Sequence, residues 1–219
     1  MTFLATYKSE GFIPRGLIAG NSALLISESI SLLVGRHLRG TLLGRVTLGE
    51  ITAAAAPGNT GNGVLSLDPA TPRLDGAQAG VYTVVCTAEA ANGGTFAVTD
   101  PQGNALGTVA VGAVFSSQVK FTIADGPEDF DVGDAFEIAV AAGLGGFVLS
   151  VSSASDGSQV PEAILAEDTD ATEAPAPTIA YTRGDFIAGD VIFGAGHTAE
   201  SVRAGLRSKG IFLIDQVPV

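Results

Sequence analysis

Apolar and polar residues alternate along the middle of the chain, most clearly in Val119-Lys120-Phe121-Thr122-Ile123 and Phe136-Glu137-Ile138-Ala139-Val140. A period of two is typical of strands with one buried and one exposed face. Turn-forming pairs such as Asn92-Gly93 and Asp125-Gly126 separate these β-rich runs. We expect six strands here, at residues 64–67, 80–88, 94–99, 107–111, 117–124 and 135–140. Their spacing predicts a small β-sandwich.

Shorter apolar runs lie on both sides of this region. We expect strands at residues 23–26, 30–34, 41–51, 147–151, 163–166, 178–182 and 211–214, the last of them buried. An acidic loop with two prolines, residues 167–177, separates two of these strands, which are expected to pair across it. One helix is predicted at residues 199–209, because Thr198 suits its N-terminal cap and Gly210 ends it. The chain is therefore predicted to be mainly β, with one short C-terminal helix.

Two glycine-rich stretches, residues 58–63 and 143–146, mark changes in composition. Such stretches are flexible, so we expect the chain to leave one domain at the first and return to it at the second. This predicts an extended N-terminal arm at 1–20, a discontinuous β-rich base at 21–57 and 146–219, and an inserted sandwich at 58–145. The arm is apolar without a helical period. It is expected either to pack on its own domain or to add as a strand to a partner's sheet edge.

The charge is unevenly distributed. The 219 residues carry a net charge of −12, and only 16% of them are charged. Residues 48–182 hold two basic and seventeen acidic side chains, whereas residues 1–47 and 183–219 together hold nine basic and six acidic ones. The acidic middle is either a well-solvated surface or a sign that the ends face an acidic partner. Nucleic acid is not expected as that partner, since no basic cluster with interleaved aromatic residues is present.

The location of the protein is suggested by what the sequence lacks. No apolar run reaches the roughly 18 residues of a membrane helix, and the N-terminus does not have the pattern of a signal peptide. The single cysteine, Cys86, excludes an intrachain disulfide and suits a reducing compartment. We expect no membrane association and synthesis in the cytoplasm.

Residues suited to catalysis or metal binding are sparse. The two histidines, His37 and His197, have no cysteine or histidine companion at metal-ligand spacing. A serine or cysteine hydrolase needs a base beside its nucleophile, and these two histidines are the only ones that the sequence offers for that role. The acidic stretch 125–134 offers oxygen ligands for calcium, but it does not fit the EF-hand pattern. We expect no enzymatic activity, no cofactor and no metal.

Gly35-Arg36-His37-Leu38-Arg39-Gly40-Thr41-Leu42-Leu43-Gly44-Arg45 is the most distinctive stretch outside the sandwich. Further pieces are Leu17-Ile18-Ala19-Gly20, Ser27-Glu28-Ser29-Ile30, Ala163-Ile164-Leu165-Ala166-Glu167-Asp168, Arg183-Gly184-Asp185-Phe186 and Leu206-Arg207-Ser208-Lys209-Gly210-Ile211-Phe212. In this order they resemble the lambda-like head decoration proteins of tailed bacteriophages. The likeness covers about residues 15–56 and 147–219. The insertion between them departs from the family and looks like an immunoglobulin-like sandwich of the kind found on phage surfaces.

The resemblance implies a structural protein of the virion surface. Members of the family form trimers on the outside of the expanded head, at three-fold and quasi-three-fold positions, and clamp neighbouring subunits of the major capsid protein. Their N-terminal segments lie against the shell, which implies capsid contact by Phe3, Leu4, Tyr7, Phe12, Ile13, Leu17 and Ile18. Contacts of the base and the homotrimer would involve Arg36, Arg39, Arg45, Arg203 and Arg207.

A second function remains open at this point. The sandwich alone is compatible with an adhesin or receptor-binding module of a phage tail or cell surface, with a cell-surface ligand. A decoration protein should bind expanded heads in multiples of three. An adhesin should bind cells or glycans and ignore the shell.

Overall fold

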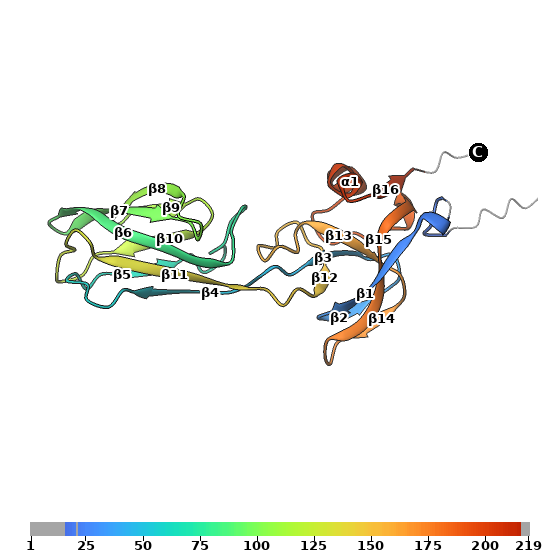
Figure 1. Ribbon diagram of the computed structural model, residues 1–219, viewed down its shortest axis with the longest axis horizontal. Coiled ribbons are helices and arrows are strands. Elements are labelled where there is room, and N and C mark those ends of the chain that lie inside the picture. The colour runs from blue at the N-terminus through green and yellow to red at the C-terminus, as the bar shows by residue number, and fades with distance from the viewer. Residues whose placement is uncertain (1–15, 21, 216–219) are drawn as a thin grey trace, which may run out of the picture.

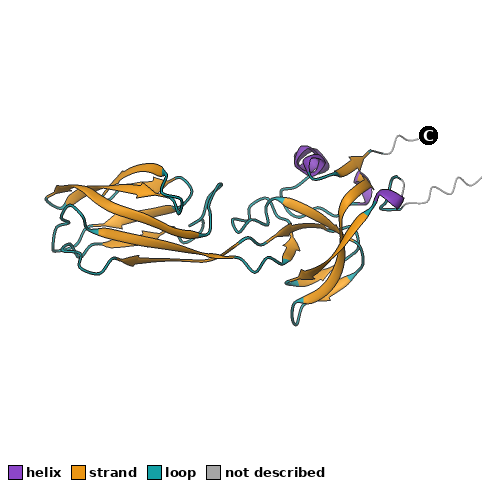
Figure 2. Ribbon diagram, viewed as in Figure 1, coloured by secondary structure: helices purple, strands orange, loops and turns teal. Residues whose placement is uncertain are grey.

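The computed structural model describes residues 16–20 and 22–215, which form two lobes joined end to end (Figure 1). One lobe is a β-sandwich. The other, the base, contains the helix and both ends of the described chain. Strands dominate both lobes (Figure 2), which confirms the prediction of a mainly β chain with one short helix near its C-terminus.

The base is built around a small closed barrel. Its elements are η1 (Ser22–Leu24), β1 (Ile26–Leu32), β2 (Gly35–His37), β3 (Leu42–Arg45), β12 (Phe147–Leu149), β13 (Pro161–Leu165), β14 (Thr169–Ala171), β15 (Ala176–Ile187), η2 (Ala188–Asp190), α1 (Ala199–Ser208) and β16 (Ile211–Ile214). The order β1-β12-β3-β13-β15 returns to β1, because β1 pairs with both β12 and β15. The C-terminal half of β15 extends beyond the barrel and pairs with β16 in parallel. Strands β2 and β14 form a separate two-stranded ribbon.

Two apolar clusters stabilise the base. One fills the barrel and includes Leu32, Leu43, Phe147 and Leu165. The other lies between the barrel and α1. Its buried residues are Leu17, Leu42, Ile164, Phe186, Ala188, Val191, Val202, Leu206, Ile211 and Leu213. Strand β3 contributes Leu43 to the cluster inside the barrel and Leu42 to the cluster beneath α1. Successive side chains of this short strand therefore link the two clusters.

The predicted helix is confirmed as α1. The Thr198 hydroxyl accepts a hydrogen bond from the Ser201 backbone N–H at 3.2 Å, and the Ser201 hydroxyl accepts one from the Thr198 N–H at 2.9 Å. This reciprocal cap satisfies donors that an isolated helix start leaves unpaired. At the other end, Gly210 has a φ of 83°, a conformation that favours glycine and ends the helix.

The sandwich contains two sheets. Its strands are β4 (Leu48–Ala55), β5 (Val64–Leu67), β6 (Gly80–Ala90), β7 (Gly93–Thr99), β8 (Ala105–Ala110), β9 (Val114–Ser116), β10 (Lys120–Ala124) and β11 (Ala135–Ala142). A five-stranded sheet has the order β4-β11-β6-β7-β8, and a three-stranded sheet has the order β5-β10-β9. Phe96, Phe130 and Phe136 pack with ring centroids 5.0 to 5.8 Å apart in the core that the sandwich encloses.

The boundary of the insertion differs from the prediction. Residues 48–57 were expected in the base, but β4 pairs along its length with β11 and Leu48 lies in the sandwich core. The four alanines at 53–56 are all the same size, so the sequence does not show which of their side chains are buried or which sheet they join. The glycine-rich stretch at 58–63 is a turn of the sandwich, held by the Asp134 carboxylate, which accepts from the N–H of Thr60 and of Gly61 at 2.8 Å. The insertion therefore spans residues 48–142.

Some strand boundaries also differ. The expected strand at 23–26 is η1 and the first residue of β1, and the expected strand at 41–51 is divided between β3 in the base and β4 in the sandwich. The run at 117–124 begins later, at β10, and β9 was not predicted. The expected pairing across the acidic loop is confirmed, with Ile164 opposite Tyr181 in β13 and β15. The last strand, β16, alternates buried and exposed residues instead of being fully buried.

A paired ribbon connects the lobes, not a flexible joint. The Gly143 N–H donates to Thr47 O at 2.8 Å, the Gly145 N–H to Val46 O at 3.0 Å, and the Val46 N–H to Gly146 O at 2.9 Å. A Cβ at Gly143 would lie 2.4 Å from Val46 O, so glycine is what allows the two strands to approach here. The ribbon enters the barrel as the adjacent strands β3 and β12.

Candidate interaction surface

The described part of the N-terminal arm packs on its own base. Leu17 is 4% exposed and belongs to the cluster beneath α1, and Ile18 forms an antiparallel bridge with Phe186. Backbone hydrogen bonds link Ala19 N–H to Asp185 O and Ile187 N–H to Leu17 O, both at 2.9 Å. The expectation that Leu17 contacts a capsid is corrected, because its side chain is buried in the protein's own core. Ile18 is half-buried at the same site.

The other arm residues expected at the capsid lie outside the described residues. They are Phe3, Leu4, Tyr7, Phe12 and Ile13. The described chain nevertheless fixes where the arm joins the base, because residues 17–19 pair with β15 and the described chain begins at the end of the base remote from the sandwich (Figure 1).

Exposed apolar residues occur at this same end of the base. Leu24 and Ile26, in η1 and at the start of β1, are 61% and 46% exposed. Phe212 and Ile214, on the outward side of β16, are 38% and 46% exposed. These elements lie beside the two ends of the described chain (Figure 1). We call the four residues the terminal face. The apolar run at 211–214 was predicted to be buried. It forms a short edge strand in which successive side chains point to opposite sides, so half of them face outward.

The five arginines predicted for base and trimer contacts do not converge. Arg203 is held within the base by both carboxylate oxygens of Asp215, at 2.8 and 2.9 Å. Arg36 and Arg39, near the β2–β14 ribbon, and Arg207 on α1 are exposed. Within residues 16–20 and 22–215 the side chains of these last three make no hydrogen bond or ion pair, although the charge of Arg36 helps to lower the pKa of Asp170.

The fifth, Arg45, belongs to a charged cluster on Glu162. Arg45 Nε donates to Glu162 Oε2 at 3.0 Å, and its guanidinium lies 4.6 Å from the centre of the Phe147 ring. Lys209 Nζ donates to Glu162 Oε1 at 3.3 Å and to Pro161 O at 3.0 Å. Burial raises the pKa of Glu162, but the hydrogen bonds and charges of Arg45 and Lys209 outweigh it and leave this pKa below its ordinary value of 4.5. The cluster joins β3, β13 and the end of α1.

Replacing Glu162 with Gln should weaken the base in a pH-dependent way. Because the pKa of Glu162 is lowered by folding, its contribution to stability is present above pH 4.5 and lost as the pH falls through the lower folded-state pKa. The three side chains are about a third exposed, so we expect a loss of about 0.5–1 kcal/mol at pH 7. Urea unfolding between about pH 7 and pH 3 should show a shallower acid dependence for the variant. Glu200→Gln is the control, since Glu200 is 94% exposed. Parallel acid profiles for Glu162→Gln and the wild type would contradict the assignment.

The two histidines have structural surroundings. Ser150 is fully buried, and its hydroxyl donates to Ser158 O at 2.7 Å and lies 3.2 Å from His197 Nε2. This contact ties the loop before α1 to the loop before β13. His37 lies in β2, where its ring is close to Gly35. The Ser150 proton is committed to a carbonyl, so the pair is not arranged as an activated nucleophile.

Carboxylates in the acidic stretch 125–134 hold backbone turns. Asp134 is 5% exposed, and burial raises its pKa, but the N–H groups of Gly61, Thr60 and Asp131 donate to it and leave this pKa lowered. Asp129 accepts from the Asn92 N–H at 2.8 Å. Among the described residues, no group of three or more His, Cys, Asp and Glu side chains is placed to hold a metal ion.

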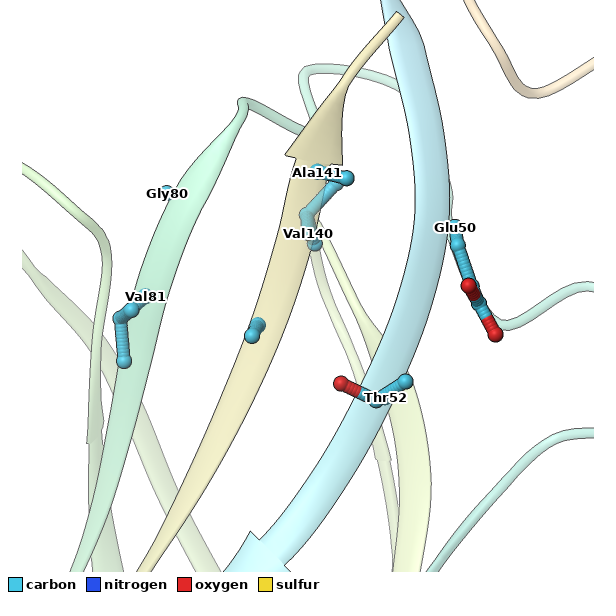
Figure 3. A pocket seen from close by; sticks show the side chains of 7 residues that line it. Glu50, Thr52, Gly80, Val81, Val140 and Ala141 are labelled. Carbon is cyan, nitrogen blue, oxygen red and sulfur yellow. The ribbon is translucent and has the colours of Figure 1, made fainter.

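A shallow groove crosses the outer side of the five-stranded sheet (Figure 3). Glu50 and Thr52 of β4 line one side, Gly80 and Val81 of β6 the other, and β11 passes between them. Among the described residues that line it, the polar side chains are one carboxylate and one hydroxyl, and the rest are small and apolar. The groove therefore lacks the convergent polar groups that orient a ligand.

The revised boundary also changes the distribution of charge. The sandwich, residues 48–142, has two basic and eleven acidic side chains. The remaining residues have nine basic and twelve acidic ones, because residues 143–182 add six acids to the base. The charge of the base is thus nearly balanced and is not basic as a whole, and the strong excess of negative charge belongs to the sandwich.

In the described part of the chain, no helix is both long and apolar enough to span a membrane.

Comparison with known proteins gives little further guidance. No family model and no curated protein matches the chain. Two crystal structures of FlgL from Xanthomonas campestris match 48% of the chain and 33% of their own length, with 26% and 27% sequence identity. Their TM-scores are 0.32 and 0.31. The chain thus spans about a third of FlgL, and the low scores define neither a common fold nor a common function.

Proposed function

We propose that this protein is a structural decoration protein of a bacteriophage head, which binds the outer face of the expanded shell and stabilises it. The supporting observation is that the two stretches resembling head decoration proteins, separated by almost a hundred residues, close one barrel. Their strands β1, β3, β12, β13 and β15 interlock through pairings between distant parts of the chain. A domain divided by an insertion accounts for that arrangement.

The two ends of the molecule differ, and this difference supports a particular orientation on the shell. The sandwich leaves the base at one end, while the arm joins at the other, beside the terminal face (Figure 1). Four exposed apolar side chains on η1, β1 and β16 give this end of the base apolar surface that a partner can cover. The acidic sandwich is well suited to face solvent. In this arrangement the base and arm contact the major capsid protein at three-fold positions as a homotrimer, and the sandwich points outward.

The sandwich should be dispensable for shell binding. Thr47 O and the Gly143 N–H are already hydrogen-bonded as the first and fourth residues of a tight hairpin would be. Replacing residues 48–142 with Asn-Gly should therefore close the ribbon and leave the barrel intact. We expect its affinity for undecorated expanded heads, measured by co-sedimentation, to stay within about threefold of the full chain, a difference below about 0.7 kcal/mol.

Two outcomes would contradict this arrangement. A shortened protein that folds but does not bind heads would place the shell contacts on the sandwich. A full-length protein that ignores expanded heads but binds cells or glycans would favour the adhesin function instead. Circular dichroism and thermal unfolding of the shortened protein provide the control for folding.

A further inference from the structure

A second surface feature lies between the lobes, away from the terminal face. Loop residues 71–75, which connect β5 to β6, project from the end of the sandwich nearest the base (Figure 1). Together with residues 152–155 and Gln159 of the base they line a pocket. Each lobe thus contributes one wall, and the pocket exists only because the paired ribbon holds the lobes at this distance.

Arg73 is the cationic side chain of this pocket. Its position is fixed by the backbone, because Arg73 bridges Val119, the Lys120 N–H donates to Pro72 O, and the Leu74 N–H donates to Gln118 O. The guanidinium Nη1 donates to Gly49 O. The guanidinium Nε is buried and has no hydrogen-bond partner.

An unpaired, buried donor on a charged group is costly. Hydrogen bonds to charged groups contribute about 1.5–3 kcal/mol, and a buried donor left without one loses its hydration as well. Nearly all such donors in native proteins are satisfied, so the unpaired Nε leaves this pocket-lining guanidinium with an unmet hydrogen bond. Guanidinium groups bind the oxygens of carboxylates and phosphates especially well, since their N–H groups form a planar fork.

The other wall offers further donors. Gln159 Oε1 already accepts from the Gly157 N–H at 2.9 Å, so the amide nitrogen of Gln159 is left to donate elsewhere. The hydroxyls of Ser153 and Ser155 form no hydrogen bond with any group in residues 16–20 and 22–215. Asp75 is the opposing charge, and its side chain is exposed to solvent.

We infer that this pocket binds a small oxyanion, a carboxylate or phosphate group, which accepts from the Arg73 guanidinium and from donors of the base loop. The bound anion bridges the two lobes and restricts their relative motion. Arg73 is one of only two basic residues in the sandwich, the other being Lys120. Lys120 is already paired with Asp68 at 3.0 Å, so Arg73 is the basic side chain of the described sandwich that has no carboxylate partner.

The test is an NMR titration of the full chain that follows the Arg73 Nε–Hε resonance. Sodium phosphate and sodium acetate are added in separate arms at constant ionic strength, with sodium chloride as the reference. We expect a saturable shift with at least one oxyanion and none with chloride. Hydrogen exchange in residues 71–75 and 152–159 should slow as the site fills, since both walls are bridged. The arm with the tighter binding identifies the preferred group.

Two variants make the inference falsifiable. Arg73→Gln should weaken binding about ten- to hundredfold, which corresponds to one charge-assisted hydrogen bond. Gln159→Glu keeps the acceptor for the Gly157 N–H but adds a negative charge to the pocket, and it should weaken binding about tenfold or more even if Arg73→Gln does not fold. Arg36→Gln, at an exposed arginine of the base, is the matched control. Non-saturable shifts that chloride reproduces, or unchanged binding in Gln159→Glu, would overturn the inference.

Discussion

Removal of residues 1–15 is expected to leave a folded protein that binds expanded heads at least about thirtyfold more weakly. In the proposed function the arm lies against the shell, and its five aromatic and aliphatic residues, Phe3, Leu4, Tyr7, Phe12 and Ile13, supply buried apolar contacts. Loss of several such anchors commonly costs more than about 2 kcal/mol of binding free energy. Co-sedimentation with undecorated heads measures the loss.

The point of truncation matters, because the structure divides the predicted arm into two parts. A cut before Gly16 keeps Leu17 in the cluster beneath α1 and keeps the backbone pairing with β15. A longer deletion of residues 1–20 removes both, and loss of a buried leucine alone costs about 2–5 kcal/mol. The longer deletion should therefore lose stability as well as binding, whereas the shorter one should lose binding alone.

A full-length variant separates side chains from backbone. Serine at the five apolar arm positions leaves the chain length unchanged and should weaken shell binding as the truncation does. Val132→Ser is the control, since Val132 is 60% exposed on the sandwich and is expected to have no effect. Head binding that is unchanged by the truncation would show that the arm does not contact the shell.

Leu43→Ala should strongly destabilise the base. Leu43 is fully buried and packs in the barrel with Leu32, Phe147 and Leu165. Truncating such a side chain leaves a cavity in a barrel whose strands are short, and we expect a loss of about 2–5 kcal/mol in the free energy of unfolding. Urea unfolding, with hydrogen exchange to locate the change, should assign the loss to the base.

The chain offers a matched control for this substitution. Leu144 lies in the connecting ribbon and is 84% exposed, so Leu144→Ala should change the free energy of unfolding by less than about 0.5 kcal/mol. Similar losses for both variants would contradict the barrel core described above. Faster hydrogen exchange in the sandwich as well as in the base would show that the lobes share their stability.

Features set by nearby residues could be predicted from the sequence. The cap at Thr198 and the end at Gly210 define α1 because both depend on side chains and backbone within a few residues. The β13–β15 pairing followed from two apolar runs on either side of one loop. Alternation in 119–123 and 136–140 likewise indicated strands with one buried face, and β10 and β11 occupy these positions.

Features that depend on distant residues could not be predicted. Nothing local shows that β1 pairs with β12 in parallel and so closes the barrel. The alanine run at the end of β4 lacks a size pattern, and its membership of the sandwich is set by pairing with β11 more than eighty residues later. The anchoring of Arg45 on Glu162 spans 117 positions. The unpaired Nε of Arg73 depends equally on the folded backbone around it.

In the proposed function the base is fixed to the shell, and the paired ribbon then has a mechanical consequence. A drag force on the sandwich pulls both connecting strands in the same direction, so it does not slide one past the other or peel their hydrogen bonds apart in sequence. The tension passes into β3 and β12, which lie side by side in the barrel, with Arg45 opposite Phe147. These strands are in turn bonded to β13 and β1. The load is thereby shared around the ring, and a tether of two hydrogen-bonded strands extends less under a given force than a single flexible linker does.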